Sequence, residues 1–283
     1  MQQLLKQLQE MQDSFSPSQK AVAEYIMKYY SDIPFQTITQ IAEITATSET
    51  TVSKFCKELG FSGFSGLKHL VSNYVNSSLS LNSKLEHVAK SLKEASILDE
   101  ILSSEINNIQ VTLQNSNNCD QIQPFIDMID RAKHVYTIGA RTSSFLAGIA
   151  AFKLRQQDVS ASNIEWGVGD YIDKMMMIRP GDLVIAFSFS RFTKNTVKMV
   201  RLLKQRGIPI VLITGEGLSP AYEASDLVFV CKTESRSYVA SYTACLSLIN
   251  TILITRAIYH KDHIEAYLQE LETNFEEFDI FTE

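Results

Sequence analysis

Two short stretches rich in serine and threonine carry the side chains best suited to binding an anion. The first reads Ile-Gly-Ala-Arg-Thr-Ser-Ser over residues 138–144, and the second reads Ser-Phe-Ser-Arg-Phe-Thr-Lys over residues 188–194. Each follows an apolar run typical of a strand and precedes a segment with helical periodicity. Backbone N–H groups and the helix dipole at the start of a helix favour negative charge, and hydroxyl groups add donors. The two stretches therefore predict a phosphate-binding site.

Both stretches lie at the carboxyl ends of predicted strands, where open parallel sheets bind their ligands. We therefore expect one shared site. The alternative is that serine and threonine only cap helices here, but two hydroxyl-rich turns at matching strand ends favour phosphate. The predicted ligand-binding residues are Arg141, Ser143, Ser144, Ser188, Ser190, Arg191, Thr193 and Lys194, with Glu234 after the last strand.

A second set of candidate residues lies between residues 38 and 59, where a short helix, a break and a second helix are expected. Ser48 suits the N-cap of the second helix, and Gly60 suits its C-terminal cap. Apolar residues recur inside that helix at a spacing of three and four, which gives it one buried face. This pattern is typical of a helix-turn-helix, whose second helix enters the major groove of DNA.

The outward face of that second helix carries the predicted DNA contacts. They are Glu49, Thr50, Ser53 and Lys54 near base edges, and Lys57 and Lys68 near phosphates, with the N-cap Ser48 beside them. Charge favours the alternative, a plain helical bundle with a solvated polar face. Residues 1–80 hold six lysines, seven acidic side chains and no arginine, a net charge of −1. Any contact with DNA therefore depends on the placement of individual lysines.

The elements that position these residues fall into two groups. The first 75 or so residues show helical patterns only, whereas β-rich runs alternate with helical stretches from residue 134 onward. Such alternation predicts an α/β doubly wound parallel sheet with helices on both faces. We expect a helical domain over 1–77, a linker over 78–97 and an α/β domain over 98–283. The expected strands cover 134–140, 159–165, 183–189, 208–214 and 227–232, with helices at 143–157, 170–178, 194–206 and 236–276.

Composition narrows the class of protein. No run of about 18 apolar residues is present, and the first residues lack the pattern of a signal peptide, so we expect no membrane span. The four cysteines are scattered without a Cys-x-x-Cys pair, which fits reduced thiols in the cytoplasm. Neither glycine-rich nucleotide motif occurs, and we expect His260 and His263, spaced His-Lys-Asp-His, to be a surface pair rather than a metal site. We therefore expect neither a cofactor nor a metal ion.

The sequence also resembles a known family. Residues 37–68, with the Ser-x-x-Thr-Val stretch at 48–52 and the exit after Leu59, are similar to the helix-turn-helix of RpiR/MurR-type bacterial regulators. The downstream part resembles the flavodoxin-like sugar isomerase (SIS) domain, with Gly139 and Ser143 matching one of its turns. Its second turn matches Ser188, Ser190 and Thr193.

The resemblance implies a homodimer or homotetramer that binds a palindromic operator in double-stranded DNA. It also implies that a phosphosugar bound to the SIS domain changes the affinity for DNA, with Ser143, Ser188, Ser190 and Thr193 contacting the phosphate. This sequence departs from the family at three positions. Lys54 stands where arginine is common, and Arg141 and Arg191 stand where glycine is usual.

Two other classes of function remain open from the sequence. One is a sugar-phosphate isomerase with an appended helical domain, in which Glu165 or Glu234 would supply the catalytic base. The other is a phosphosugar-responsive interaction module whose acidic helical domain binds a protein partner. We expect a regulator rather than an enzyme, because candidate catalytic groups are few.

Overall fold

The computed structural model describes residues 1–78, 82–83, 85–86, 97–165, 170–216, 219–235 and 239–282. Contacts divide the chain into two compact units. One comprises Met1–Ser104 with Ser235–Ala240, and the other comprises Glu105–Glu234 with Ser241–Glu283. Most of the predicted linker 78–97 lies outside the described residues, so the domain limits at 77 and 98 stay a prediction. In the described part of the chain, no helix is long and apolar enough to cross a membrane.

The N-terminal unit is helical, as the sequence predicts. Ser16 and Thr37 each cap a helix by a reciprocal bond with the glutamine three residues later, which satisfies two orphan N–H groups at each start. One apolar cluster holds the helices together, with Phe15 and Phe55 in edge-to-face contact at 5.0 Å. The helices are α1 (Gln2–Glu10), α2 (Pro17–Tyr29), α3 (Ile38–Ile44), α4 (Glu49–Glu58) and α5 (Phe64–Ser78), with short 3-10 turns at Gln12–Ser14 and Ile33–Phe35.

The C-terminal unit is built on a parallel five-stranded sheet in the order β2-β1-β3-β4-β5. All five predicted strands are present within two residues of their expected limits. The expected helix over 236–276 is instead two helices that meet at His260. The strands are β1 (Val135–Gly139), β2 (Ala161–Ile164), β3 (Leu183–Ser188), β4 (Ile210–Gly215) and β5 (Leu227–Cys231).

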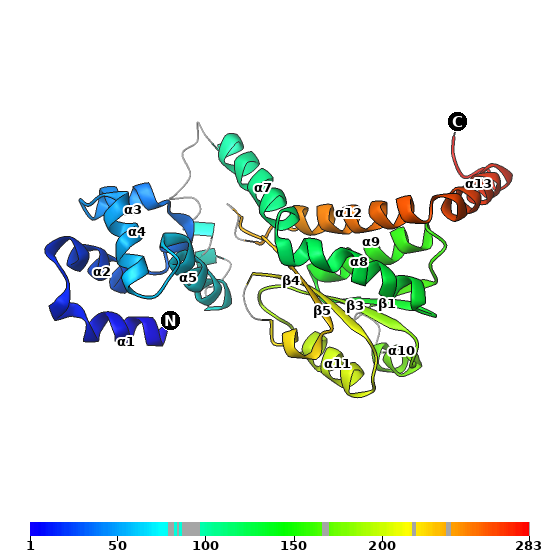
Figure 1. The fold of residues 1–283 in the computed structure, drawn as a ribbon, viewed down its shortest axis with the longest axis horizontal. Helices are drawn as coiled ribbons and strands as arrows, with labels where there is room; N and C mark the ends of the chain where they lie inside the picture. The colour runs from blue at the N-terminus through cyan, green and yellow to red at the C-terminus, as the bar shows by residue number, and fades with distance from the viewer. Residues whose placement is uncertain are drawn as a thin grey trace. The chain divides into compact units, whose positions relative to one another are not determined.

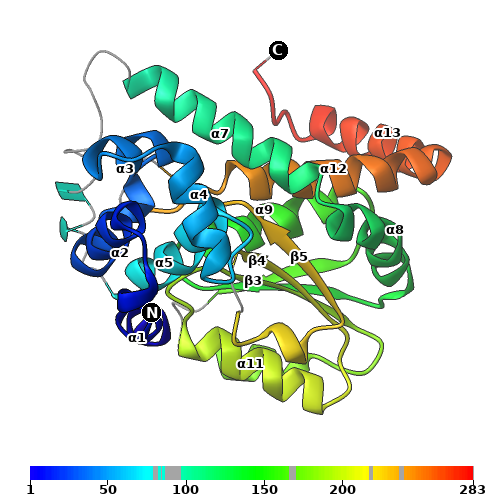
Figure 2. The same ribbon diagram turned by 60° about the vertical axis from the view of Figure 1, so that its left-hand side comes forward.

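Helices cover both faces of this sheet. Figure 1 shows α8 (Ser116–Arg131), α9 (Thr142–Arg155) and α12 (Thr243–Tyr259) on one face, with α10 (Tyr171–Met177) and α11 (Lys194–Gln205) on the other. Figure 2 shows the same two layers from a second direction. Successive residues of β3 point into the two different apolar clusters that result, so the strand is buried throughout. The α/β doubly wound class is confirmed. The remaining helices are α7 (Ile97–Leu113) and α13 (Lys261–Glu277).

Side chains of α7 and α8 occupy the exposed hydrogen-bonding edge of β5. The amide of Gln121 bonds both the N–H and the carbonyl of Val228, at 2.9 and 3.0 Å, and Asn118 does the same for Val230, at 2.9 and 2.8 Å. Thr112 accepts the next N–H, from Lys232, at 2.8 Å. These three side chains substitute for a sixth strand and prevent this edge from pairing with another chain.

The strand order reverses at β1. The chain leaves β1 through α9 to reach β2 on one side, then returns through α10 to β3 on the other side of β1. Connections on opposite faces leave a crevice beyond the carboxyl ends of β1 and β3, which is where sheets of this strand order bind ligands. The two hydroxyl-rich stretches follow these two strands.

Candidate functional site

The helix-turn-helix has the geometry that the sequence predicts. The Ser48 hydroxyl accepts the Thr51 N–H at 3.1 Å and so caps α4, while Gly60 adopts a φ of +91° just after the helix. Ile41 and Ala42 of α3 and Phe55 of α4 are buried in the same apolar cluster. The buried faces of the two helices therefore fix the angle between them and leave the opposite face of α4 in solvent.

The predicted DNA contacts lie on that solvent face of the unit. Five of them are exposed, and Ser53 on α4 and Lys68 on α5 are half-buried. In the described part of the chain, Lys54 and Lys57 form no ion pair. The exposed residues are Ser48, Glu49, Thr50, Lys54 and Lys57.

Two acidic side chains of this helix are engaged within the unit. Thr39 of α3 donates to the Glu49 carboxylate at 2.5 Å, and Gln19 of α2 donates to Glu58 at 2.5 Å. Glu49 also lies in the first turn of α4, where the helix dipole favours its charge. These bonds restrict both carboxylates, whereas the two lysines remain able to approach an anion.

A second site lies at the end of β1, where a glycine allows an unusually close approach. A Cβ atom on Gly139 would lie 2.3 Å from the carbonyl oxygen of Ser143, so only glycine permits α9 to begin this close to the strand. Gly139 is in register with Phe187 of β3. The first turn of α9 is thereby held at the junction of the two central strands.

The serines in this turn do not cap α9. Arg141 occupies the N-cap position and makes no side-chain capping bond. Ser144 donates its hydroxyl to the Arg141 carbonyl at 2.6 Å, and Ser143 is buried, with 7% of its surface exposed. No side chain of this stretch therefore makes the capping bond to a backbone N–H that the alternative explanation requires.

Ser188 is buried at the end of its strand. It is the last residue of β3, within the expected strand 183–189, and only 4% of it is exposed. Its carbonyl accepts a bond from Thr214 of the neighbouring strand at 2.6 Å. Among the described residues, its buried hydroxyl oxygen has no hydrogen-bond partner. A buried hydroxyl without a partner costs free energy, and it is common at sites that receive a ligand or a water.

The rest of the second stretch is accessible. Ser190, Arg191 and Lys194 are exposed. Thr193 has the N-cap position of α11, but its hydroxyl bonds that of Thr196 at 2.7 Å rather than a backbone N–H. The start of α11 is therefore also without a side-chain cap, which leaves it able to receive an anion.

Glu234 takes part in an ion cluster. It follows β5, two strands from β3, and its carboxylate lies 3.5 Å from the Lys232 ammonium. Glu216 lies 2.9 Å from the same ammonium. Burial lowers the pKa of Lys232, but the two carboxylates more than compensate, so its pKa is raised. The structure thus places Glu234 in an ion cluster beyond β4 and β5.

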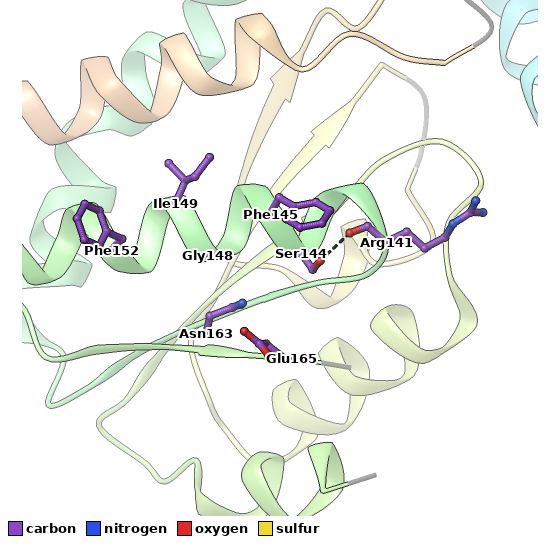
Figure 3. A pocket seen from close by; sticks show the side chains of 8 residues that line it. All are labelled: Arg141, Ser144, Phe145, Gly148, Ile149, Phe152, Asn163 and Glu165. Atoms are coloured by element: carbon purple, nitrogen blue, oxygen red, sulfur yellow. Dashed lines mark hydrogen bonds between the residues drawn. The ribbon is translucent and has the colours of Figure 1, made fainter. Parts of the chain in front are cut away.

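An open pocket of about 690 Å³ extends from the start of α9 along the edge strand β2. Figure 3 shows α9 along one wall, with Asn163 and Glu165 of the β2 end opposite. The sequence did not lead us to expect its apolar wall. The available signal was a set of apolar residues on α9 spaced by four and then three positions. That wall consists of Phe145, Ile149 and Phe152, which are 72%, 37% and 54% exposed.

An aromatic pair lies near Arg141. Phe189, directly after Ser188, packs edge-on against Tyr242 with ring centroids 5.0 Å apart. Burial raises the pKa of the Tyr242 phenol, and the positive charge of Arg141 partly opposes that rise. Tyr242, at the N-cap of α12, was not expected at this site, because no sequence pattern marks it.

The two histidines considered for metal binding have separate partners. His260 lies 2.8 Å from Asp130, and His263 lies 3.1 Å from Asp158. Within the described ranges, no group of three or more His, Cys, Asp or Glu side chains is arranged to hold a metal ion.

Comparison with known proteins identifies both parts of the chain. A model of the helix-turn-helix domain of the rpiR family matches residues 2–78, and a SIS domain model matches residues 128–255. An HTH-type transcriptional regulator of Clostridium perfringens is 26% identical over 258 residues, which are 90% of this chain and 87% of that protein. HexR, an HTH-type transcriptional regulator of Pseudomonas aeruginosa, is 24% identical over 233 residues, covering 80% of this chain and 78% of its own.

Solved structures show the same fold. Vibrio vulnificus NanR complexed with ManNAc-6P has a TM-score of 0.59 and 21% identity, and the match covers 99% of this chain and 100% of that one. The sugar isomerase domain of an RpiR transcription factor from Sphaerobacter thermophilus also has a TM-score of 0.59, with 23% identity over 63% of this chain and 99% of its own.

Fold, site and matched regions together define a transcriptional regulator with an N-terminal helix-turn-helix domain and a SIS domain. The chain belongs to the RpiR family. The resemblance stated from the sequence is confirmed.

Proposed function

We propose that this regulator binds its operator with an affinity that a phosphorylated sugar controls, through a site at the junction of β1 and β3. The observation that carries the proposal is the buried Ser188 hydroxyl, which has no partner among the described residues. Such a group recovers its lost hydrogen bond when a ligand oxygen reaches it. Two uncapped helix starts, those of α9 and α11, follow the same pair of strands and favour a dianion there.

The proposed phosphate ligands are Ser143, Ser144, Ser188, Ser190, Thr193 and Lys194. Ser143, Ser144 and Ser190 supply further hydroxyl groups around the junction, and Lys194 supplies positive charge at the first turn of α11. Because Glu234 belongs to the Lys232 ion cluster, we leave it outside the phosphate subsite. The complex of NanR with ManNAc-6P supports the proposal, since a protein of the same fold binds a phosphorylated sugar.

The sugar itself would occupy the pocket beside β2. Asn163 and Glu165 offer polar atoms to its hydroxyl groups, and the exposed rings of Phe145 and Phe152 offer an apolar wall. This division resembles ligand pockets in general, which combine apolar walls with a few well-placed polar groups.

For DNA, we propose that α4 enters the major groove with Glu49, Thr50, Ser53 and Lys54 near base edges. Lys57, Lys68 and the Ser48 cap then approach phosphates. A homodimer or homotetramer would bind a palindromic operator in the cytoplasm, with half-sites about one helical turn apart or a multiple of it. A phosphosugar that prefers one arrangement of the oligomer then changes operator affinity by linkage.

The test is calorimetric binding of hexose 6-phosphates and N-acetylhexosamine 6-phosphates to the full chain. We expect binding by the wild type and at least tenfold weaker binding by Ser188→Ala. Ser225→Ala is the matched control, because Ser225 ends the 3-10 turn Tyr222–Ala224, between β4 and β5, and its hydroxyl donates to the Ala221 carbonyl at 2.9 Å. If Ser188→Ala binds as tightly as the control, the junction of β1 and β3 is not the site.

One observation favours a second function. Glu165 lines the pocket, within reach of a bound sugar, so a sugar-phosphate isomerase remains a specific alternative. That function requires conversion of a ketose phosphate to an aldose phosphate, detected by NMR, with loss of the conversion in Glu165→Gln. We propose that the SIS domain binds without converting, so the NMR spectrum of a ketose phosphate should not change.

A further inference from the structure

The helix α13 carries an apolar stripe that the rest of its unit leaves largely uncovered. Of its 17 residues, only Ile264 is buried. Tyr267, Leu271 and Phe275 continue the stripe at half-buried positions, and Leu268 beside them is 41% exposed. A helix of this length is marginal on propensity alone and depends on the packing of its apolar face. The stripe therefore indicates that α13 has a partner in solution.

The flanks of this stripe are strongly acidic. Residues 261–283 hold one lysine and eight acidic side chains, a net charge of −7, whereas residues 1–260 hold 25 basic and 24 acidic side chains. The helical spacing places glutamates on both sides of the stripe, namely Glu265, Glu272 and Glu276 on one side and Glu270 and Glu277 on the other. Two copies of α13 would repel each other along such a face, so a basic partner surface fits better.

One helix of the same unit has the opposite charge. The sequence of α11 contains no acidic residue, and Lys194, Lys198 and Arg201 recur at intervals of four and three, so they form one exposed stripe. The Arg201 guanidinium donates to the Pro220 carbonyl at 2.9 Å, which holds it at the surface without neutralising its charge. Among the residues that the structure describes, none of the three cations forms an ion pair.

Apolar side chains are exposed at the far end of that helix. Leu202 on α11 is 48% exposed. Arg206, just after α11, donates to the Ile178 carbonyl at 2.5 Å and so holds the end of α10 against the end of α11. Met176 and Met177 on α10 are both exposed, and methionine side chains adapt readily to the shape of an apolar partner. This part of the unit therefore combines positive charge with apolar area, which is what α13 requires.

The two surfaces belong to opposite faces of one sheet. The helix α11 packs on β3 and β4, whereas α13 packs on α12, which covers the other face (Figures 1 and 2). Contact between the acidic and the basic surface is therefore contact between two copies of the chain. Their lengths are similar, since 17 and 12 helical residues span about 25 and about 18 Å.

We infer that α13 of one copy docks on α11 and the end of α10 of a second copy. Its apolar stripe covers Leu202 and the two methionines, and its glutamates lie beside Lys198 and Arg201. This inference goes beyond the proposed function and does not depend on a phosphosugar. DNA phosphates would also attract the cations of α11, but they would leave the stripe of α13 uncovered. A contact between copies satisfies both surfaces at once, which is why we favour it.

The experiment is analytical ultracentrifugation of the full chain without DNA, at about 50 and about 500 mM salt. We expect an association step whose dissociation constant rises at least tenfold at the higher salt, because exposed charges are then screened. Lys198→Glu with Arg201→Glu should weaken the same step at least tenfold at low salt. Glu272→Lys with Glu276→Lys should do the same, because each pair of changes places like charges opposite each other.

A variant with all four changes tests the pairing itself. It restores opposite charges in exchanged positions, so its dissociation constant should return to within threefold of the wild type. Lys54→Glu with Lys57→Glu is the matched control, because it makes the same charge change at the same spacing on the exposed face of α4. The control should leave association unchanged. Circular dichroism of each variant checks that it is folded.

Three results would overturn the inference: a wild type that remains monomeric at both salt concentrations, association that the reversals leave unchanged, or losses that the combined variant does not recover. An equal loss in the control would also contradict it, because the effect would then follow net charge alone. Reversals on α11 that weaken operator binding but not association would assign that surface to DNA phosphates instead.

Discussion

Replacing Ser188 by alanine separates a ligand-binding role from a structural one. The hydroxyl is buried and has no hydrogen-bond partner among the described residues, so no hydrogen bond offsets the cost of removing it from water. Mutational data place the cost of such an unpaired group at about 1–3 kcal/mol. Removing the oxygen atom also leaves a small void. The void costs on the order of 1 kcal/mol and so offsets part of this gain. We expect Ser188→Ala to be as stable as the wild type or more stable, by up to about 2 kcal/mol.

The assay is urea unfolding of the α/β unit in the full chain, followed by fluorescence and circular dichroism in the absence of any sugar phosphate. The control is Thr214→Val in the neighbouring strand, whose hydroxyl donates to the Ser188 carbonyl at 2.6 Å. Losing that bond should destabilise the protein by about 1 kcal/mol. Opposite signs for two buried hydroxyls in adjacent strands would show that one is structural and the other is reserved for a ligand.

A loss of stability in Ser188→Ala would refute this reasoning. It would mean that the hydroxyl has a partner in solution and that the crevice does not hold an unsatisfied donor. The proposed phosphate site would then lose its main support, whatever the effect of the substitution on ligand binding.

Three further predictions concern the helix-turn-helix, the strained turn and the edge of the sheet. Lys54→Glu should weaken operator binding at least tenfold in a mobility-shift assay and leave sugar-phosphate binding unchanged. Lys20→Glu on α2 is the control and should weaken operator binding less. Equal losses in the two variants would contradict the assignment of α4 to the major groove. Arg141→Gly should raise the free energy of unfolding by about 0.5–2 kcal/mol, because relief of about 1–3 kcal/mol of strain exceeds the entropy cost of a glycine; a destabilised variant would show that the turn is not strained. Asn118→Leu should lower the free energy of unfolding in urea by about 3–5 kcal/mol, because the amide loses three hydrogen bonds to Thr112 and Val230. Asn117→Leu, at an exposed position, should change that free energy little. Similar values for both variants would disprove the strand-like role of the Asn118 amide.

The architecture was predictable because its signals are local or periodic. Continuous apolar runs indicate buried parallel strands, and Ser16, Ser48 and Gly60 are residues whose chemistry ends or begins a helix wherever they occur. The pairing of the two hydroxyl-rich turns also followed from the sequence, because parallel strands end at the same edge of a sheet.

What the sequence did not reveal depends on contacts between distant residues. The burial of Ser188 is set by β4, whose Thr214 lies 26 positions later and bonds the Ser188 carbonyl rather than its hydroxyl. The pocket forms only when α9 lies against the end of β2, so Asn163 joins Phe145 through tertiary packing. The contact between the Glu234 carboxylate and Lys232 at the end of β5 was likewise not readable from the sequence.

The backbone of Arg141 belongs to the same category. Nothing local distinguishes an arginine with a φ of +56° from any other, and the departure from the RpiR-family pattern at Arg141 did not by itself predict a strained turn. The structure supplies the physical meaning of that departure, since the turn geometry suits glycine and the arginine is retained against it.

The central claim, control of operator binding by a phosphosugar, is tested most directly by selecting sheared genomic DNA with the purified full chain at about 100 mM salt. The selection is performed with and without a pool of sugar monophosphates, sugar acid phosphates and bisphosphates, and the bound DNA is sequenced. The account predicts strong enrichment of one palindromic site, with an enrichment that changes at least tenfold when the pool is present. Enrichment that the pool leaves unchanged would contradict control by a phosphosugar, and the absence of any enriched site from folded protein would contradict the operator itself.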